Sequence, residues 1–148
     1  MMIRAAQAQD LPAIEALLAS FDLTTAGVAQ SLGGFLVAED GDEMVALAGL
    51  EVYGAGALLR SVAVREAYRN RGLAKTLVHR LVSLARSTGV REVYLLTATA
   101  QQYFQRLGFE PVPRAAVDPA VTSSAEFGDA CCATAVAMRM TLTGGGRG

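Results

Sequence analysis

One stretch near the middle of the chain constrains the fold more than any other, because an apolar segment, a basic turn and a long amphipathic segment follow one another directly. The apolar segment covers residues 57–64 (ALLRSVAV). Leucines then recur at helical spacing: Leu73, Leu77, Leu81 and Leu84. This spacing predicts a helix with one apolar face that ends at Gly89, and a second apolar segment follows at residues 91–98 (REVYLLTA). Together the three pieces predict two parallel strands joined by a helical crossover.

The first part of the chain predicts one helix and an antiparallel arrangement of strands. Residues 2–5 form a short first strand, and Asp10 is the expected N-cap of an amphipathic helix. Two apolar runs, residues 34–40 and 43–54, lie on either side of a turn at Gly41 and predict a hairpin. With the apolar segment described above they give three consecutive strands.

The last part predicts shorter elements. We expect a helix over residues 100–107, a strand that starts at Phe109 and a final strand within residues 133–142. The predicted fold class is therefore α/β (α+β), with a mixed central sheet of six to seven strands flanked by about four helices. Residues 1–142 form a single domain in this prediction, and residues 143–148 (TGGGRG) form a disordered tail.

Length and charge exclude several classes of protein. The 148 residues suffice for one hydrophobic core and are short for two. With 13 basic and 14 acidic residues, nothing in the charge favours binding to nucleic acid or to an anionic membrane surface. Charges or glycines interrupt each apolar stretch before the ~20 residues of a membrane span, and the N-terminus lacks the apolar core of a signal peptide. We therefore expect a cytoplasmic protein.

The chain offers few residues that ligate metals. Its only histidine, His79, falls on the polar side of the long predicted helix, where we expect it to face solvent. Cys131 and Cys132 are adjacent, which disfavours a disulfide between them, and we interpret them as small apolar residues of a terminal strand. No metal site is predicted.

A basic turn containing glycine leads into the long helix, at residues 69–74 (RNRGLA). A helix N-terminus offers several N–H groups and the positive end of the helix dipole, which suits a phosphate group. Gly72 has no Cβ to block the approach of an anion, and Ala74 is also small. Three cations surround this point: Arg69, Arg71 and Lys75. The pattern indicates a phosphate site, although basic turns of this kind also occur on ordinary solvated helix starts.

These motifs together resemble the GNAT superfamily of N-acetyltransferases over nearly the whole chain. RNRGLA is similar to the superfamily's acetyl-CoA loop, Q/R-x-x-G-x-G/A. Residues 62–69 (VAVREAYR) resemble V-x-P-x-Y-R, with Glu66 in place of proline, and residues 103–112 (YFQRLGFEPV) resemble Y-x-x-x-G-F. The resemblance implies the GNAT fold and acetyl-CoA as cosubstrate, with no metal.

Within the superfamily, residues 95–109 (LLTATAQQYFQRLGF) resemble N-acetylglutamate synthases and the GNAT proteins of arsenic-resistance operons. Residues 124–138 (SAEFGDACCATAVAM) favour the arsenic-operon group. Two positions depart from that group's pattern, since Cys132 replaces a proline and Thr134 a serine.

The resemblance implies a cofactor site along one strand and the following loop. The pyrophosphate contacts would be Arg69, Asn70, Arg71, Gly72, Leu73, Ala74 and Lys75. Main-chain groups of Val62, Ala63 and Val64 would pair with the pantetheine arm, and the N–H of Val62 would polarise the thioester oxygen. Thr97 and Thr99 are candidate hydroxyl contacts. Phe104 lines this site at the position where many members carry a tyrosine acid, so we expect no strong general acid.

Four polar residues are candidates for the acceptor side. Glu51 is the best candidate base, with binding of a substrate cation or a plain surface position as alternatives. Arg60 interrupts an apolar strand and suits a substrate carboxylate, unless it faces an edge or a cofactor phosphate. Ser61 points away from Arg60 unless a bulge intervenes. Glu126 is a candidate to close the substrate site.

The predicted function is transfer of an acetyl group to the amino group of a small, carboxylate-bearing molecule, an amino acid or an arsenic-containing analogue. One alternative is a catalytically weak acetyl-CoA sensor, which the missing tyrosine motivates. Another is acetylation of protein N-termini. A homodimer would be ordinary for the family.

Overall fold

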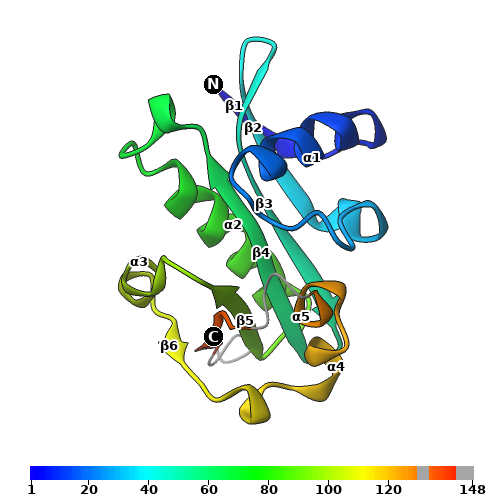
Figure 1. The fold of residues 1–148 in the computed structure, drawn as a ribbon, viewed down its shortest axis with the longest axis vertical. Helices are drawn as coiled ribbons and strands as arrows, with labels where there is room; N and C mark the ends of the chain where they lie inside the picture. The colour runs from blue at the N-terminus through cyan, green and yellow to red at the C-terminus, as the bar shows by residue number, and fades with distance from the viewer. Residues whose placement is uncertain (130–133, 143–148) are drawn as a thin grey trace. The chain divides into compact units, whose positions relative to one another are not determined.

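The computed structural model describes residues 1–129 and 134–142, and the predictions made for Cys131, Cys132 and residues 143–148 lie outside these residues (Figure 1). The strands are β1 (Met2–Ala5), β2 (Phe35–Asp40), β3 (Glu43–Tyr53), β4 (Gly56–Val64), β5 (Glu92–Thr97), β6 (Glu110–Pro111) and β7 (Val136–Thr141). They form one mixed sheet in the order β1-β2-β3-β4-β5-β7-β6. The predicted fold class is confirmed.

Helices connect these strands. The α-helices are α1 (Leu11–Ser20), α2 (Leu73–Ser87), α3 (Gln101–Arg106), α4 (Pro119–Thr122) and α5 (Ala125–Gly128). Short 3-10 helices are η1 (Ala8–Asp10), η2 (Ala29–Gly34), η3 (Glu66–Tyr68) and η4 (Arg114–Ala116). Among the described residues, no helix combines the length and the apolar composition needed to cross a membrane.

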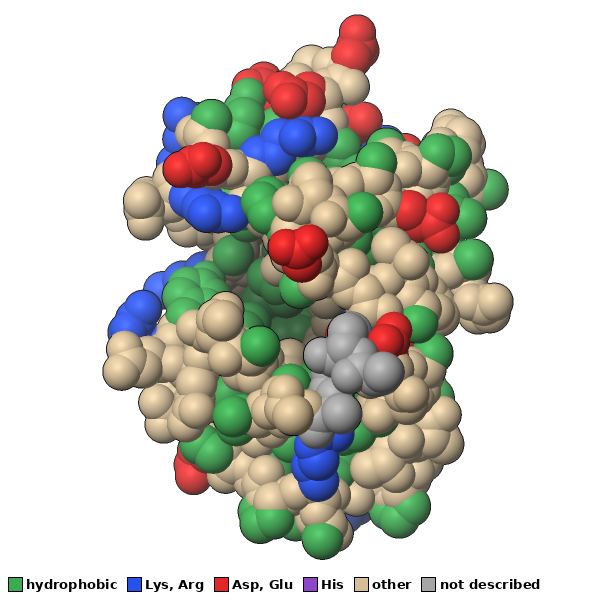
Figure 2. Space-filling view, in the orientation of Figure 1, with side chains coloured by type: hydrophobic (Ala, Val, Ile, Leu, Met, Phe, Trp, Pro, Cys, Tyr) green, Lys and Arg blue, Asp and Glu red, His purple; other side chains and the backbone are tan. Residues whose placement is uncertain are grey.

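The chain divides into two compact units. The first contains Met1–Glu51 and Leu59–Leu81, and the second contains Val52–Leu58 and the described part of Val82–Gly148. Strand β4 runs through both units, with its end at Val64 in the first. On the face that Figure 2 shows, acidic and basic side chains are interspersed, as the near balance of charge leads one to expect.

The first unit is an antiparallel set of strands covered by α1. Strand β2 pairs with β1 and with β3, and the predicted turn between β2 and β3 is made by Gly41 at φ 63°. Its core is apolar and largely excluded from solvent: Ile14, Leu17, Leu18, Val28, Phe35, Val37, Met44, Leu47 and Ala63. Gly49 is required here because a Cβ at this position would collide with the ring of Phe35. The hairpin prediction is confirmed.

Arg4 ties the N-terminal strand to α1 and β2. Its guanidinium donates to both carboxylate oxygens of Asp10 at 2.7 and 2.9 Å and to those of Glu39 at 2.9 and 3.0 Å. Asp10 is the N-cap residue of α1 as predicted, but its side chain makes no capping bond to that helix and instead accepts the Gln7 N–H at 2.7 Å. The predicted cap position is therefore confirmed, while the Asp10 carboxylate bonds Arg4 and Gln7 and not the N–H groups of α1.

The second unit contains the parallel pairing that the sequence predicts. Strand β4 pairs in parallel with β5, placing Leu58 opposite Tyr94, and β7 lies antiparallel between β5 and β6. One core cluster of this unit consists of Leu58, Tyr94, Val117, Val121 and Ala137.

The long helix α2 is confirmed, with one correction to its apolar face. Leu84 is 50% exposed, whereas Val78, Val82 and Ala85 are buried. At 100° per residue Leu84 lies about 60° from Leu81, between Leu73 and Leu77, so the helical period alone does not predict its exposure. His79 is exposed, as predicted.

Two short helices, α4 and α5, occupy a region for which the sequence predicted no element. Asp118 caps α4 by accepting the Ala120 N–H at 2.9 Å, and Pro119 stands at the first helical position. Ser124 caps α5 by accepting the Phe127 N–H at 3.3 Å. The Asp-Pro pair and the serine were the available signals, but helices of one turn have too few residues for a periodic pattern.

Replacing Asp10 by Asn should reduce stability at neutral pH and make less difference in acid. Hydrogen bonds from Arg4 lower the pKa of Asp10 to about 2, from a usual value of 3.8. A lowered carboxyl pKa stabilises the fold above the unfolded-state value, and this contribution disappears as pH falls through the folded value. We expect the difference in unfolding free energy between wild type and Asp10→Asn to be constant above about pH 5 and to shrink toward pH 2. Urea unfolding from pH 7 to 2 measures it, and Asp42→Asn in the exposed turn is the control.

Candidate active site

The basic turn predicted to bind phosphate lies in the first unit, between η3 and α2. Two of its residues have left-handed backbone, Asn70 at φ 65° and Gly72 at φ 75°. A Cβ added to Gly72 would meet no atom within 4 Å, so the space beside it is open. The first helical bond runs from the Thr76 N–H to the Gly72 carbonyl at 3.0 Å, and the N–H groups of Leu73, Ala74 and Lys75 precede it. Turns of this kind followed by a helix N-terminus concentrate N–H donors for an anion.

Aromatic rings hold two of the three cations of this turn. The Arg69 guanidinium lies 5.2 Å from the centre of the Phe21 ring, and its Nε donates to the Val64 carbonyl at 3.0 Å. Arg71 lies 5.1 Å from the Tyr68 ring, whose hydroxyl donates to Asp40 at 2.6 Å. Stacking restricts the side chains while leaving them exposed to solvent. The turn therefore presents positive charge in a partly fixed arrangement.

The strand residues expected to pair with pantetheine precede this turn. Ala63 is buried in the core of the first unit, while Val62 and Val64 are half-buried. Just beyond the strand, the Arg65 N–H donates to the Val45 carbonyl at 2.8 Å. In this stretch the side chain of Ala63 therefore belongs to the core, whereas those of Val62 and Val64 remain partly exposed.

Two candidate acceptor residues form one buried ion pair in the first unit. Arg60 Nη1 donates to Glu51 Oε2 at 3.0 Å, and the two side chains are 0% and 6% exposed. The same Glu51 oxygen accepts the Ser31 hydroxyl at 3.0 Å. The prediction considered Glu51 and Arg60 separately, whereas the structure joins them.

Arg60 has three further partners within this unit. Nη1 also donates to the Ala26 carbonyl at 2.6 Å, and Nη2 donates to the Thr24 carbonyl at 3.2 Å. Nε donates to Ser61 Oγ at 2.9 Å. Ser61 has left-handed backbone, at φ 60°, which breaks the strand alternation expected to separate the two side chains. The left-handed Ser61 therefore brings its hydroxyl to the side of Arg60, which strict alternation along the strand would not allow.

The remaining candidates lie in the second unit. Thr97 is buried, and its hydroxyl accepts the Ala100 N–H at 3.0 Å, while Thr99 is exposed. Phe104 is 8% exposed and packs edge-on against Phe109, with ring centres 6.0 Å apart. Glu126 is buried in the first turn of α5.

Tyr103 directly precedes Phe104, the position where the resemblance implies an acid. Its ring packs edge-on against that of Phe104, with centres 5.3 Å apart. Burial raises the pKa of Tyr103, although the charge of Arg106 opposes this. A phenol with a raised pKa is a weaker proton donor.

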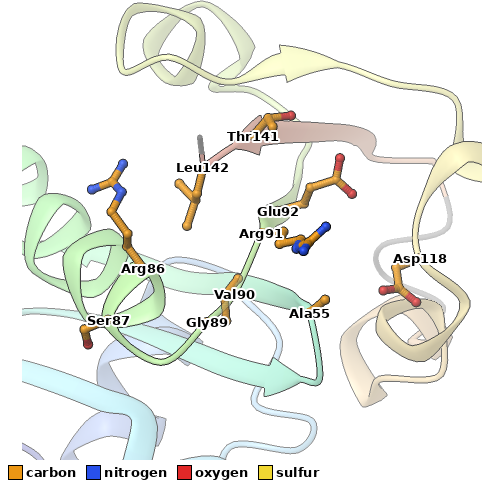
Figure 3. Close-up of a pocket in the computed structure, with 10 residues that line it drawn as sticks. All are labelled: Ala55, Arg86, Ser87, Gly89, Val90, Arg91, Glu92, Asp118, Thr141 and Leu142. Atoms are coloured by element: carbon orange, nitrogen blue, oxygen red, sulfur yellow. The ribbon is translucent and has the colours of Figure 1, made fainter. Parts of the chain in front are cut away.

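A cavity of about 980 Å³ lies in the second unit, between the end of α2, the start of β5 and the end of β7 (Figure 3). Its charged lining residues are Arg86, Arg91, Glu92 and Asp118. None of the residues predicted for the cofactor or the acceptor lines it. The cavity therefore lies apart from the residues predicted to bind the cofactor and the acceptor.

Across the described ranges, 1–129 and 134–142, no group of three or more His, Cys, Asp or Glu side chains is arranged to hold a metal ion.

A family model described as an acetyltransferase (GNAT) domain matches residues 31–111. An uncharacterized N-acetyltransferase of Chlorobaculum tepidum, CT2212, is 34% identical over 56 residues. That match covers 38% of this chain and 36% of the relative, so the chain corresponds to little more than a third of that protein.

Solved structures share the fold at lower identity. Rv2747 from Mycobacterium tuberculosis, in complex with CoA and a second ligand, is 23% identical with a TM-score of 0.78, over 96% of this chain and 99% of the other. N-acetylglutamate synthase from Neisseria gonorrhoeae, complexed with CoA and N-acetyl-glutamate, is 16% identical with a TM-score of 0.83. That match covers 95% of this chain and 35% of the synthase.

Removing one partner of the buried ion pair should destabilise the protein strongly. Glu51→Ala leaves the Arg60 guanidinium buried without its counter-charge, for which we expect a loss of about 3–5 kcal/mol in the free energy of unfolding. Glu43→Ala, on the same strand, removes a pair with Arg65 in which both side chains are 42–55% exposed, and we expect a loss of ~0–1 kcal/mol. Urea titration measures both. Equal losses would contradict the assignment of a tightly coupled buried pair.

Proposed function

The chain belongs to the GNAT acetyltransferase family, and from this premise we propose that it transfers an acetyl group from acetyl-CoA to the amino group of a small, carboxylate-bearing molecule. The basic turn before α2 carries this proposal. It combines an open space beside Gly72 with a helix N-terminus and two stacked arginines, Arg69 and Arg71. This is the combination that a pyrophosphate requires.

On the donor side we propose that the turn, from Arg69 to Lys75, holds the pyrophosphate of acetyl-CoA. Main-chain groups of Val62, Ala63 and Val64 would then pair with the pantetheine arm. The Val62 N–H follows the left-handed Ser61, and in this proposal it polarises the thioester oxygen. Thr97, Thr99 and Phe104 complete the proposed set of cofactor contacts.

The proposed reaction is a direct attack. The neutral amine of the acceptor forms a C–N bond to the thioester carbon, the C–S bond breaks, and the amine proton passes to a base. Deprotonating an α-amine of pKa ~8 at pH 7 costs about 1.4 kcal/mol, whereas a lysine-type amine of pKa ~10.4 costs about 4.6 kcal/mol. A base is therefore useful for either acceptor, and more so for the second.

We propose Glu51 as that base, acting directly or through a water molecule. Among the acceptor-side candidates of the first unit, Glu51 is the one with a carboxylate. Hydrogen bonds from Arg60 and Ser31 hold its Oε2 in place. A base fixed in this way does not have to be oriented during the reaction. Ser61 and Glu126 are further proposed acceptor-side residues, and Arg60 belongs to this side through its pair with Glu51.

We propose no general acid for the departing thiolate. A thiol of pKa ~8.5 leaves without its proton at pH 7 for only about 2 kcal/mol. Phe104 has no proton to donate, and the raised pKa of Tyr103 makes its phenol a poor substitute. Positioning and main-chain electrostatics would supply most of the rate enhancement.

The proposal also covers the class of acceptor, the domain organisation, the location and the oligomeric state. An amino acid or an arsenic-containing analogue suits the resemblance to N-acetylglutamate synthases and to the arsenic-operon group. We also propose a single domain over residues 1–142, a cytoplasmic location and a homodimer.

Replacing Gly72 by Ala tests the phosphate contact. The methyl group would occupy the open space where we propose that phosphate oxygens approach, and φ 75° is disfavoured for alanine by roughly 1–2 kcal/mol. Gly41→Ala is a matched control, because Gly41 has φ 63° with equally open surroundings in the β2–β3 turn. We expect similar losses of thermal stability in both variants, and at least about a tenfold loss of acetyl-CoA affinity by calorimetry only in Gly72→Ala. Unchanged affinity would remove Gly72 from the site.

The activity itself is tested by CoA release from acetyl-CoA over an amine panel. The panel contains free L-amino acids, their α-carboxamides, an arsenic-containing amino acid, a polyamine and a short peptide. We expect release with the free amino acids or the arsenical. Binding of acetyl-CoA without release would favour a sensor, release with the peptide alone would favour acetylation of protein N-termini, and absence of binding would refute the proposal.

A further inference from the structure

Arg60 joins three separate pieces of the first unit. It reaches β3 through Glu51, its own strand β4 through Ser61, and the segment between α1 and β2 through two carbonyls. The hydroxyl of Ser31, in the same segment, bonds the Glu51 oxygen that Arg60 contacts. A single guanidinium thus fixes the relative placement of the carboxylate, the strand irregularity and the segment.

The left-handed backbone of Ser61 is a conformation that neighbouring contacts must stabilise. A non-glycine residue at φ 60° is disfavoured because its Cβ crowds the following carbonyl, and such residues persist where their surroundings hold them. The hydrogen bond from Arg60 Nε to Ser61 Oγ supplies that hold from the preceding residue. Since Ser61 and Val62 share a peptide bond, the same contact sets the direction of the Val62 N–H.

Direct recognition of a substrate fits this arrangement poorly. A guanidinium has five N–H donors, and those of Arg60 already reach two carbonyls, a carboxylate and a hydroxyl, with the side chain 0% exposed. A substrate carboxylate that gripped Arg60 bidentately would have to displace protein partners. Losing them would leave polar groups without partners in a buried region.

We infer that Arg60 is a positioning residue, which locks Glu51 and the Ser61–Val62 peptide into the arrangement used for acyl transfer. This inference rests on the proposed function, because it concerns the same site. In this inference Arg60 does not contact the substrate. It acts on the reaction through Glu51, Ser61 and residues 24–26.

The kinetic test compares two acceptors that differ in one charge. With the best free amino acid of the panel and its α-carboxamide, Arg60→Met should lower kcat/KM by about 10- to 100-fold for both, since small misplacements of reacting groups cost factors of this size. The affinity for acetyl-CoA should change less than about twofold. A loss confined to the free amino acid would overturn the inference, because it would show that Arg60 binds the substrate carboxylate.

A second variant guards against simple unfolding. Ser61→Gly removes the hydroxyl that Arg60 contacts, while glycine adopts φ 60° without strain. A merely structural role predicts an unchanged kcat, whereas the inference predicts a lower kcat with no loss of thermal stability. In the double variant with Arg60→Lys, the losses should not add, because both changes break the same contact. Additive losses would count against the inference.

Hydrogen exchange provides a readout that does not depend on turnover. Arg60→Met should increase amide exchange in residues 24–31, whereas Arg80→Met, on the exposed side of α2, should not. Unchanged exchange in that segment would overturn the inference even in an active enzyme. If wild type releases no CoA with any amine, the proposed function fails, and the exchange experiment still decides whether Arg60 holds the segment.

Discussion

The first unit depends on the compensation of one buried positive charge. A guanidinium excluded from water is costly unless hydrogen bonds and an opposite charge replace its hydration. Arg60 obtains these from β3, from β4 and from the segment after α1, so the elements that surround it must be close together for the charge to be tolerated. The apolar core nearby is non-directional and would accept several packings, whereas this set of hydrogen bonds accepts few.

The charges of the basic turn are arranged in the opposite way. Arg69 and Arg71 remain exposed and are held by aromatic rings, which leaves part of each guanidinium available. Among the described residues neither arginine forms an ion pair, so an anion can approach them without breaking one. The same residue type serves two purposes in one unit: buried arginine fixes geometry, and exposed arginine presents charge. The segment after α1 contacts both the exposed and the buried arginine, since Phe21 lies against Arg69 and the Thr24 carbonyl accepts from Arg60.

Much of the fold followed from periodic patterns, and the features that were not predicted have two different causes. The strands, the helix α2 and the parallel crossover were predicted because each buries a repeated apolar face. Helices α4 and α5 are too short to show a period, and caps at Asp118 and Ser124 specify them instead. The Asp10 cap went wrong because a residue on another element, Arg4, competes for the carboxylate. Local rules fail where a tertiary contact is stronger.

The site shows the same division between local and tertiary information. The basic turn is contiguous, so its residues could be listed from sequence, whereas the left-handed backbone of Asn70 and Gly72 was not predicted. Glu51 and Arg60 could be named individually, but their pairing depends on how β3 and β4 lie against each other. The left-handed Ser61 gives no sequence signal, because serine is not a residue that favours this conformation. Site residues that are contiguous in a motif can therefore be predicted from the sequence. Site residues that meet through a buried contact, such as Glu51 and Arg60, can be paired only when the alignment of the strands is known.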